Sequence, residues 1–303
     1  QWLQITQNQL ENVLRQQRED GSFRYQGPYQ KGHFEDTASG YCGRFAVLLL
    51  DAAYVTGNKR TLEAGIKSLE YMKRFRTPRG AQTWELSLHT PDILASAHLV
   101  HAYVRGYQLT GNREYLQLAR RWALTGIPFV YMWGEYPVML YATIPVYGAT
   151  NWRAPNWIGL PVQWCGLVYA YSLTLLAPYD NTLDWHRLAE GILIAGEQMQ
   201  VPREEGDYAG LLPDSFHIRL QRRQGPFINP CALVNLRLAL DGKPHRLEVA
   251  ADEAHRVVSP FPVRLEGRQA VIQGQAGTRY QIVVDGQRVI SVNSRGTDVV
   301  PLD

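Results

Sequence analysis

The sequence predicts a mainly α-helical protein, with antiparallel helical hairpins over residues 1–240 and a small antiparallel β domain over residues 241–303. Two nearly identical helix–helix junctions recur in the first part, and each lies between an apolar helical stretch and an amphipathic one. The hydrophobic period then changes from about 3.6 to about 2 near Asp241. With 303 residues and 45% hydrophobic content, the chain can bury one large core or two smaller ones.

The two junctions share Thr-Gly-Asn followed by a basic residue, beginning at Thr56 and at Thr110. The glycine suits the left-handed position that ends a helix, and the asparagine suits the N-cap of the next helix. Each junction therefore predicts a tight turn between two helices. The spacing of about 54 residues between them indicates the repeated unit of a stacked helical array.

The helix before each junction is apolar nearly all round, as expected of an inner helix, whereas the helix after it carries charge on one face. A third pair follows without a Thr-Gly-Asn junction, and Asn181 is the expected N-cap of its second helix. The predicted inner and outer helices pair as 41–55 with 59–73, 93–109 with 113–124, and 162–176 with 182–199.

Five short segments after Asp241 alternate in polarity or are rich in β-branched residues, which predicts strands. Asp-Gly turns at 241 and 285 and a Glu-Gly turn at 266 accompany them. We therefore expect a small β-sandwich-like domain. It contains no tryptophan, and Phe261 and Tyr280 are its only aromatic residues, so a supporting domain is favoured over a carbohydrate-stacking module.

The regular recurrence of helical hairpins resembles that of the (α/α) toroids, the six-hairpin glycosidase superfamily of glycoside hydrolases and polysaccharide lyases. The segment QREDGSF at 17–23 is also similar to an element found at hairpin ends in such toroids and in terpene cyclases, but the acidic motifs of the cyclases are absent. The resemblance covers residues 1–240. It implies an enzyme that acts on a poly- or oligosaccharide in an extracellular or periplasmic setting.

A closed ring of six hairpins needs twelve helices, whereas the sequence predicts seven or eight before Asp241. We therefore expect either an open ring or an array that lacks helices at its start. The chain opens on an amphipathic helix with neither an initiator methionine nor a signal peptide, so we expect it to begin inside a processed or truncated protein.

The charge balance argues against nucleic acid as a partner. Thirty-one Lys and Arg face 28 Asp and Glu, for a net charge of +3, whereas backbone binding needs a concentrated basic face. No apolar run is long enough to predict a membrane span. The sequence does not indicate an oligomeric state.

Neither a metal nor a cofactor is predicted. The cysteines at 42, 165 and 231 lie far apart and are expected to be small buried residues. His89, His98 and His101 lack an HExxH context, so zinc binding is disfavoured. No P-loop, dinucleotide-binding or G-x-S-x-G motif occurs, and we expect no cofactor.

The loops that lead into the inner helices of such an array converge on one rim, where binding sites are expected. These loops are rich in aromatic residues, which either stack on sugar rings or form the small core of a long loop. Trp164 belongs to this aromatic cluster. The expected substrate-binding residues are Trp84, Trp133, Trp152, Trp157, His33, His89, Tyr141 and Arg153.

Glycoside hydrolysis needs one protonated and one ionised carboxyl group. Glu85 is the first candidate for the acid, because it follows a tryptophan in a low-charge segment that favours the protonated form. Asp36 is the first candidate for its partner, with Glu135 and Asp214 behind it. Asp36 equally suits the N-cap of the helix that follows it, which is a purely structural role.

Two alternatives remain open. In a lyase on the same scaffold, a tyrosine or histidine removes the proton next to a uronate carboxylate. A non-catalytic glycan-binding or structural protein is the third hypothesis, motivated by the short helix count. The lyase groups would be His33, His89, Tyr141, Asn151 and Arg153.

Overall fold

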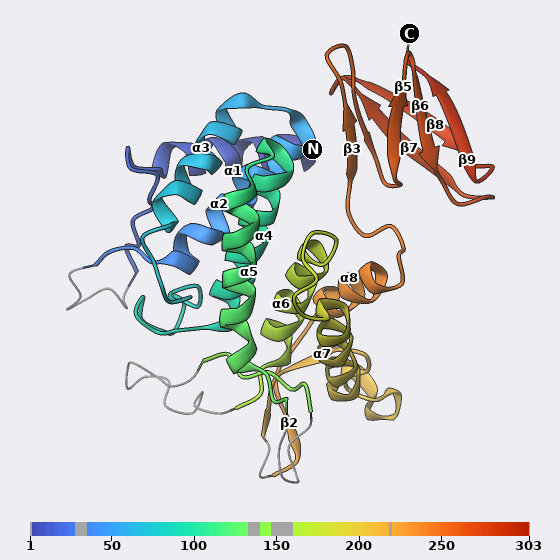
Figure 1. The fold of residues 1–303 in the computed structure, drawn as a ribbon. Helices are drawn as coiled ribbons and strands as arrows, with labels where there is room; N and C mark the ends of the chain where they lie inside the picture. Colours follow the sequence, from blue (N-terminus) through green and yellow to red (C-terminus); the bar gives the residue numbers. More distant parts are fainter. Residues whose placement is uncertain (1, 28–34, 133–139, 147–159, 218–219, 303) are drawn as a thin grey trace.

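The computed structural model of the protein describes residues 2–27, 35–132, 140–146, 160–217 and 220–302 (Figure 1). Within them, a helical body precedes a group of strands, β3–β9, which lies beside it at the C-terminal end of the chain. The helices are α1 (Trp2–Gln16), α2 (Ser39–Thr56), α3 (Lys59–Met72), α4 (Ile93–Thr110), α5 (Arg113–Gly126), α6 (Gln163–Leu176), α7 (Trp185–Met199) and α8 (Cys231–Leu240).

The helices form an inner row and an outer row. In the inner row, α2 packs against α4 and α4 against α6, while each outer helix, α3, α5 or α7, packs on the inner helix before it. Helix α4 is buried on most sides, and its Leu99 and Tyr103 are fully enclosed. The hairpin architecture predicted from the sequence is confirmed, because apolar inner helices bury their whole circumference and amphipathic outer ones bury a single face.

The two Thr-Gly-Asn junctions adopt the same structure. In each, the glycine has φ 71°, and the threonine hydroxyl donates to the carbonyl four residues earlier at 2.7 Å. The same hydroxyl accepts from the asparagine N–H at 3.2 Å. The asparagine side chain then caps the next helix, with Asn58 accepting from Arg60 and Thr61 and Asn112 accepting from Glu114. The predicted left-handed glycines and N-caps are therefore confirmed.

Helix α7 begins at Trp185, later than the predicted start at 182, whereas α4 begins at Ile93 as predicted. Asp184, not Asn181, caps α7, because the Asp180 side chain accepts bonds from Thr182 and the Trp185 indole and holds the intervening residues in a turn. At the start of α4, the residue before Asp92 pairs with Arg79 in an isolated β-bridge. Asp92 is therefore the N-cap of α4, and its carboxylate accepts from Ala95 N–H at 2.8 Å.

A β-hairpin stands where the sequence analysis expected a loop. Strands β1 (Leu212–His217) and β2 (Arg222–Ile228) pair antiparallel, with an irregular register between Pro213 and Ser215. Prolines within both strands obscure the alternating pattern that would have predicted them. The hairpin is tied to the entry of α6, because Phe216 N–H donates to the Pro161 carbonyl at 2.9 Å.

The C-terminal strands form two antiparallel sheets, of order β3-β4-β7-β8 and β5-β6-β9. Val257 and Ile282 of the first sheet share one apolar cluster with Ala270 and Ile272 of the second. The Asp-Gly pair at 241 ends α8 instead of making a hairpin turn. The strands are β3 (Glu248–Ala251), β4 (Arg256–Ser259), β5 (Val263–Glu266), β6 (Gln269–Gln273), β7 (Arg279–Val284), β8 (Arg288–Asn293) and β9 (Thr297–Pro301).

Arg256 of β4 and His245, which precedes β3, contact the helical body near its inner row. Arg256 donates through Nη1 to the Tyr54 carbonyl at 2.8 Å, and the His245 ring meets the edge of Tyr171 with centroids 5.6 Å apart. Cys42 and Cys165 are buried as expected, but Cys231 at the start of α8 is exposed, so that expectation is wrong for this residue. None of the helices in the described ranges combines the length and apolarity needed to cross a membrane.

Candidate functional site

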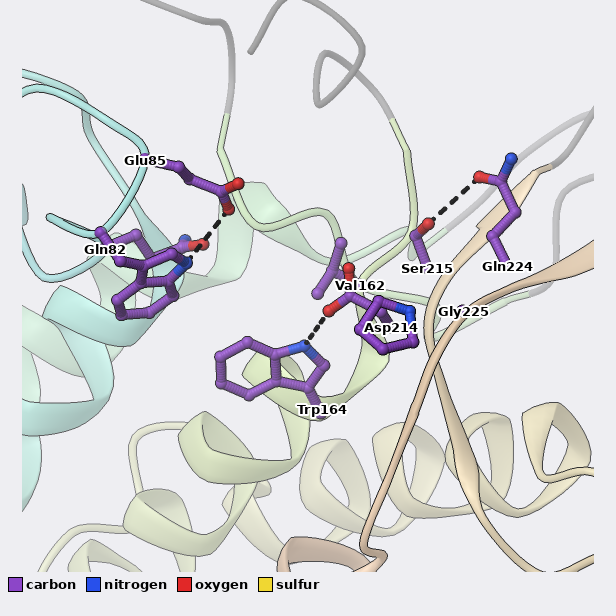
Figure 2. Close-up of a pocket in the computed structure, with 10 residues that line it drawn as sticks. Gln82, Glu85, Val162, Trp164, Asp214, Ser215, Gln224 and Gly225 are labelled. Carbon is purple, nitrogen blue, oxygen red and sulfur yellow. Dashed lines mark hydrogen bonds between the residues drawn. The ribbon is translucent and has the colours of Figure 1, made fainter. Parts of the chain in front are cut away.

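A cavity of about 540 Å³, here called the acidic cavity, lies between three parts of the chain. The loop between α3 and α4, the entry of α6 and the hairpin β1–β2 form its walls. Figure 2 shows Gln82 and Glu85 on one side, Ser215, Gln224 and Gly225 on the other, and Trp164 with Asp214 between them. The complete lining is Gln82, Trp84, Glu85, Val162, Trp164, Asp214, Ser215, Gln224, Gly225 and Pro226.

The loop that carries Trp84 and Glu85 is anchored on both sides. Gln82 before them is buried and donates to the Pro145 carbonyl at 3.3 Å, and Leu86 after them is buried in an apolar contact. Trp84 itself is 53% exposed. Because the neighbouring residues are fixed in the interior, the tryptophan and the glutamate are presented to the cavity from a defined backbone.

The entry of α6 positions Trp164 through its neighbour Gln163. The Gln163 side chain is buried, accepts from Thr143 N–H at 2.9 Å and donates to the Ile192 carbonyl at 2.8 Å. Since Gln163 occupies the interior side of this first helical turn, the next residue, Trp164, lines the cavity. An indole and the start of an inner helix are thus placed beside the hairpin β1–β2.

The two carboxylates of the cavity each accept a hydrogen bond from an indole, and the two indoles contact one another. Trp84 Nε1 donates to Glu85 Oε1 at 3.2 Å, and Trp164 Nε1 donates to Asp214 Oδ1 at 3.2 Å. The rings of Trp84 and Trp164 are stacked, with centroids 6.2 Å apart and an interplanar angle of 30°. The acidic cavity therefore combines two carboxylates with a paired aromatic surface.

Asp214 lies in surroundings that favour its protonated form. Burial raises the pKa of the Asp214 carboxyl, and the hydrogen bond from Trp164 opposes this only in part. No lysine or arginine is among the described residues that line the acidic cavity, so no cation there stabilises the carboxylate. An acid with a raised pKa beside a second carboxyl group is the arrangement that proton donation to a leaving group requires.

Asp92 lies in the interior behind this loop. It is 1% exposed and accepts from Ala81 N–H at 2.9 Å and from Ala95 N–H at 2.8 Å. Burial raises its pKa to about 7, against the effect of these backbone donors. Asp92 does not line the acidic cavity, but it ties the backbone that precedes Gln82 to the start of α4.

Asp36 lies elsewhere, in an ion pair with two arginines. Arg18 donates to both carboxylate oxygens, and Arg24 Nε lies 3.4 Å from Oδ2. These contacts, led by the hydrogen bond from Arg18, hold the pKa of Asp36 below its usual value. Asp36 is not among the residues that line the acidic cavity. The alternative of an N-cap is wrong, since the residue that precedes α2 is Ala38.

His89 and Tyr141 also lie outside the lining of the acidic cavity. His89 Nδ1 is 3.7 Å from Glu35 and 3.4 Å from Arg79, within an ion-paired cluster. The Tyr141 ring packs on Gly191 of α7, where an added Cβ would come within 2.6 Å of the ring. The lyase hypothesis needs these two side chains at one site. In the structure, His89 contacts Glu35 and Arg79, whereas Tyr141 contacts Gly191.

The remaining candidates lie outside the described residues. They are His33, Trp133, Glu135, Asn151, Trp152, Arg153 and Trp157.

Of the lining residues that were not selected from the sequence, three offer an amide or a hydroxyl group: Gln82, Ser215 and Gln224. Ser215 donates to Gln224 Oε1 at 3.2 Å across the hairpin, a contact that appears only once the strands pair. Trp164 was counted among the aromatic residues of the rim but not chosen. Its position as the second residue of an inner helix, directly after a rim loop, is the signal that could have identified it.

The two histidines of α4, His98 and His101, are buried or paired within the helical body. His101 Nε2 is 3.1 Å from Asp51 Oδ1, which also accepts from Arg105 Nε at 2.7 Å. Burial lowers the pKa of His98 to about 4, so this ring is neutral at physiological pH. Across the described ranges, no group of three or more His, Cys, Asp or Glu side chains is arranged to hold a metal ion.

Comparison with known proteins identifies the fold. No family profile and no curated protein sequence matches the chain. Among solved structures, the α-1,6-mannanase GH76A of Salegentibacter sp. HEL1_6 is similar over 80% of this chain and 66% of its own, with 15% identity and a TM-score of 0.56. The likeness shows a shared fold, in agreement with the helical hairpins that the sequence predicted.

Two further structures of this kind differ in the reactions that their names describe. The unsaturated glucuronyl hydrolase of Bacillus sp. GL1 is 15% identical, over 78% of this chain and 67% of its own, with a TM-score of 0.51. The cellobiose 2-epimerase of Bacillus thermoamylovorans B4167 is 13% identical, over 78% and 66%, with a TM-score of 0.53. The chain spans about two thirds of the length of these structures.

Proposed function

We propose that the protein is a carbohydrate-active enzyme that hydrolyses glycosidic bonds of a poly- or oligosaccharide in the acidic cavity. The observation that carries this proposal is the convergence of two carboxylates, Glu85 and Asp214, on one cavity with a stacked pair of indoles. Glycoside hydrolysis uses such a carboxylate pair on either side of the scissile bond.

The surroundings of the two carboxylates support a different role for each. Asp214 is the general acid, because burial raises its pKa, and it gives its proton to the leaving glycosidic oxygen as the bond between the anomeric carbon and that oxygen breaks. Glu85 is then the ionised partner, which either attacks the anomeric carbon or takes a proton from the attacking water. This reverses the order expected from the sequence, in which Glu85 was the acid.

The stacked indoles supply the sugar-binding surface. Trp84 is 53% exposed although its neighbours Gln82 and Leu86 are buried, so an aromatic face remains accessible beside both carboxylates. Flat aromatic faces bury the apolar faces of sugar rings, while their N–H groups keep a polar partner. The Ser215–Gln224 pair adds a hydroxyl and an amide to the opposite wall for hydrogen bonds to sugar hydroxyls.

The proteins of similar fold support the proposal without specifying a substrate. Their names describe an α-1,6-mannanase, an unsaturated glucuronyl hydrolase and a cellobiose 2-epimerase, all of which act on carbohydrates. One structure is an inactive variant of the mannanase in which two consecutive aspartates were replaced, bound to an α-1,6-mannotetrose. Carboxylates are thus required in at least one enzyme of this fold.

The test is incubation of the protein with a panel of neutral and uronic polysaccharides, reading both new reducing ends and ultraviolet absorbance. We expect reducing ends without absorbance, lost in Glu85→Gln and in Asp214→Asn. The matched control is Asp207→Asn, which replaces an exposed carboxylate of the segment between α7 and β1.

Two outcomes would contradict the proposal. Ultraviolet absorbance would indicate an unsaturated product and therefore β-elimination by a lyase. Retention of glycans with no change in chain length, unaffected by either substitution, would indicate a non-catalytic binding protein.

A further inference from the structure

A second cavity, of about 620 Å³, lies against the segment that joins α1 to α2. We call it the basic cavity, because two arginines and no carboxylate are among its described lining residues; Asp36, outside the lining, is paired with both arginines. Its lining is Gln16, Arg18, Arg24, Tyr25, Gln26, Gly27 and Tyr41.

The two arginines differ in how much of their donor capacity is used. Arg18 donates from both terminal nitrogens to the carboxylate of Asp36. Arg24 approaches the same carboxylate only through Nε, at 3.4 Å, and its side chain is 57% exposed. The terminal nitrogens of Arg24 donate no hydrogen bond to another residue that the structure describes. One guanidinium edge therefore remains available to a carboxylate from solution.

Two tyrosines that line the cavity pack together, and a third arginine, outside the lining, lies on one of them. Tyr25 and Tyr41 meet edge to face with centroids 5.4 Å apart, and the guanidinium of Arg44 lies over the Tyr41 ring at 4.2 Å. Arg44 Nε is buried and lacks a hydrogen-bond partner within the described part of the chain. The guanidinium groups of Arg18, Arg24 and Arg44 lie near two carboxylates, Asp36 and Asp20, so positive charge is in excess here, in contrast to the acidic cavity.

The two cavities adjoin. The Tyr25 hydroxyl, in the wall of the basic cavity, donates to the Thr83 carbonyl at 2.8 Å. Thr83 lies between Gln82 and Trp84, which both line the acidic cavity. One buried hydrogen bond therefore joins the wall of the basic cavity to the loop that lines the acidic cavity.

We propose that the basic cavity binds the carboxylate of a uronic acid residue in the same glycan that the acidic cavity cleaves. This inference rests on the proposed function, and it names the substrate class as an acidic poly- or oligosaccharide. Arg24 offers the planar pair of donors that matches a carboxylate, while Arg18 and Asp36 hold that arginine in position.

The test compares acidic oligosaccharides with their carboxyl-reduced forms, in which each uronate is converted to the neutral sugar. Tetrasaccharides from pectate, alginate and hyaluronan, each with its reduced counterpart, are titrated calorimetrically into the full chain carrying Asp214→Asn. We expect at least one acidic form to bind about 10-fold tighter than its reduced form, and Arg24→Gln to remove that preference.

Arg264→Gln is the matched control. Arg264 also pairs with a carboxylate through Nε, at 2.6 Å, and its side chain is 58% exposed, close to the 57% of Arg24. Because Arg264 lies on β5, away from both cavities, its replacement should leave the preference intact.

The outcomes separate this inference from the proposed function. Equal affinity for every acidic and reduced pair, or a preference that survives Arg24→Gln, would overturn the role of the basic cavity even if glycans are hydrolysed. A preference that depends on Arg24 without cleavage of any glycan would support the basic cavity and contradict the hydrolase.

Discussion

The acidic cavity and the basic cavity adjoin, yet they place their carboxylates in opposite electrostatic surroundings. Asp214 accepts a hydrogen bond from an indole and is partly buried, so its pKa is raised. Asp36 receives hydrogen bonds from Arg18 and lies near Arg24, so its pKa is lowered. The first carboxyl group is suited to donate a proton, and the second stays ionised and holds arginines in position.

The difference teaches that the role of a carboxylate depends on the cations that tertiary structure brings to it. Asp36 and Asp214 are both flanked by small or polar residues in segments that precede or follow helices, and local sequence does not separate them. A neighbouring guanidinium favours the charged form, whereas burial without a cation favours the neutral form.

The sharpest way to break this comparison is to remove each carboxylate in turn. Asp214→Asn should lower kcat by roughly 10²–10⁴-fold, because it deletes the general acid. Asp36→Asn should lower it by far less, since that carboxylate only positions arginines. Both are measured by reducing-end release on the glycan that the panel identifies. Equal losses in the two variants would contradict the assigned roles.

Asp92 adds a third carboxylate to the comparison, and like Asp214 it has no cationic partner among the described residues. Its native pKa of about 7 lies above the usual 3.8, so the folded state binds more protons than the unfolded state between these values. The stability of the protein should therefore fall as pH rises from about 4 to about 7, by an amount on the order of 4 kcal/mol.

The measurement for Asp92 is urea unfolding across this pH range. Asp92→Asn should be less stable overall, because it loses an acceptor for backbone N–H groups, but its stability should change less with pH. An unchanged slope in the variant would show that Asp92 is already ionised in the native state.

Trp84 tests the aromatic half of the acidic cavity. Trp84→Ala should raise KM by about 2- to 10-fold, the equivalent of about 0.5–1.5 kcal/mol for an aromatic contact, with little change in stability. Tyr208→Ala is the matched control, since Tyr208 is likewise 53% exposed and stacks on one neighbour, Phe227, at 4.7 Å. If both variants raise KM alike, the indole has no specific role.

The smallest expected effect concerns the stability contributed by Asp36. Its lowered pKa contributes stability that is present above the usual value of 3.8 and is lost as pH falls through the lower native pKa. The Arg18 and Asp36 side chains are 36% and 26% exposed, so solvent screening limits the effect to about 1 kcal/mol.

We expect the Tm of Asp36→Asn to be about 2–4 °C below that of the wild type near neutral pH. This difference in Tm should become smaller in acid, because the wild type then loses the same interaction. Glu266→Gln provides the comparison, because it removes an ion pair whose side chains are 58% and 54% exposed. A constant difference between the wild type and Asp36→Asn at every pH would contradict the ion-pair explanation.

Much of the helical body could be predicted from the sequence because its determinants are local. The threonine, glycine and asparagine of each junction satisfy one another within a few residues, so the turns at Thr56 and Thr110 are the same wherever they occur. The hairpin β1–β2 could not be predicted in this way. Its strands contain prolines, and their pairing depends on contacts with the entry of α6.

The candidate site was predicted in its residue types but not in its grouping. Glu85, Trp84 and Asp214 were all named from the sequence, yet Asp36 was preferred to Asp214 as the partner of Glu85. The choice turned on Arg18, which lies eighteen positions before Asp36 and meets it only in the folded chain. Trp164 gained its importance from the same kind of contact, with Asp214 fifty positions away.

The amino-acid sequence by itself determined the helical hairpins, the change to strands and the carboxylate and aromatic residues from which a site could be built, because periodicity, capping and turn chemistry act over a few neighbouring residues. Tertiary structure alone decided which carboxylates share a cavity, which one meets arginines, and therefore which one can hold a proton. Burial and charge act through space, and their effects depend on segments that the chain brings together only when it folds.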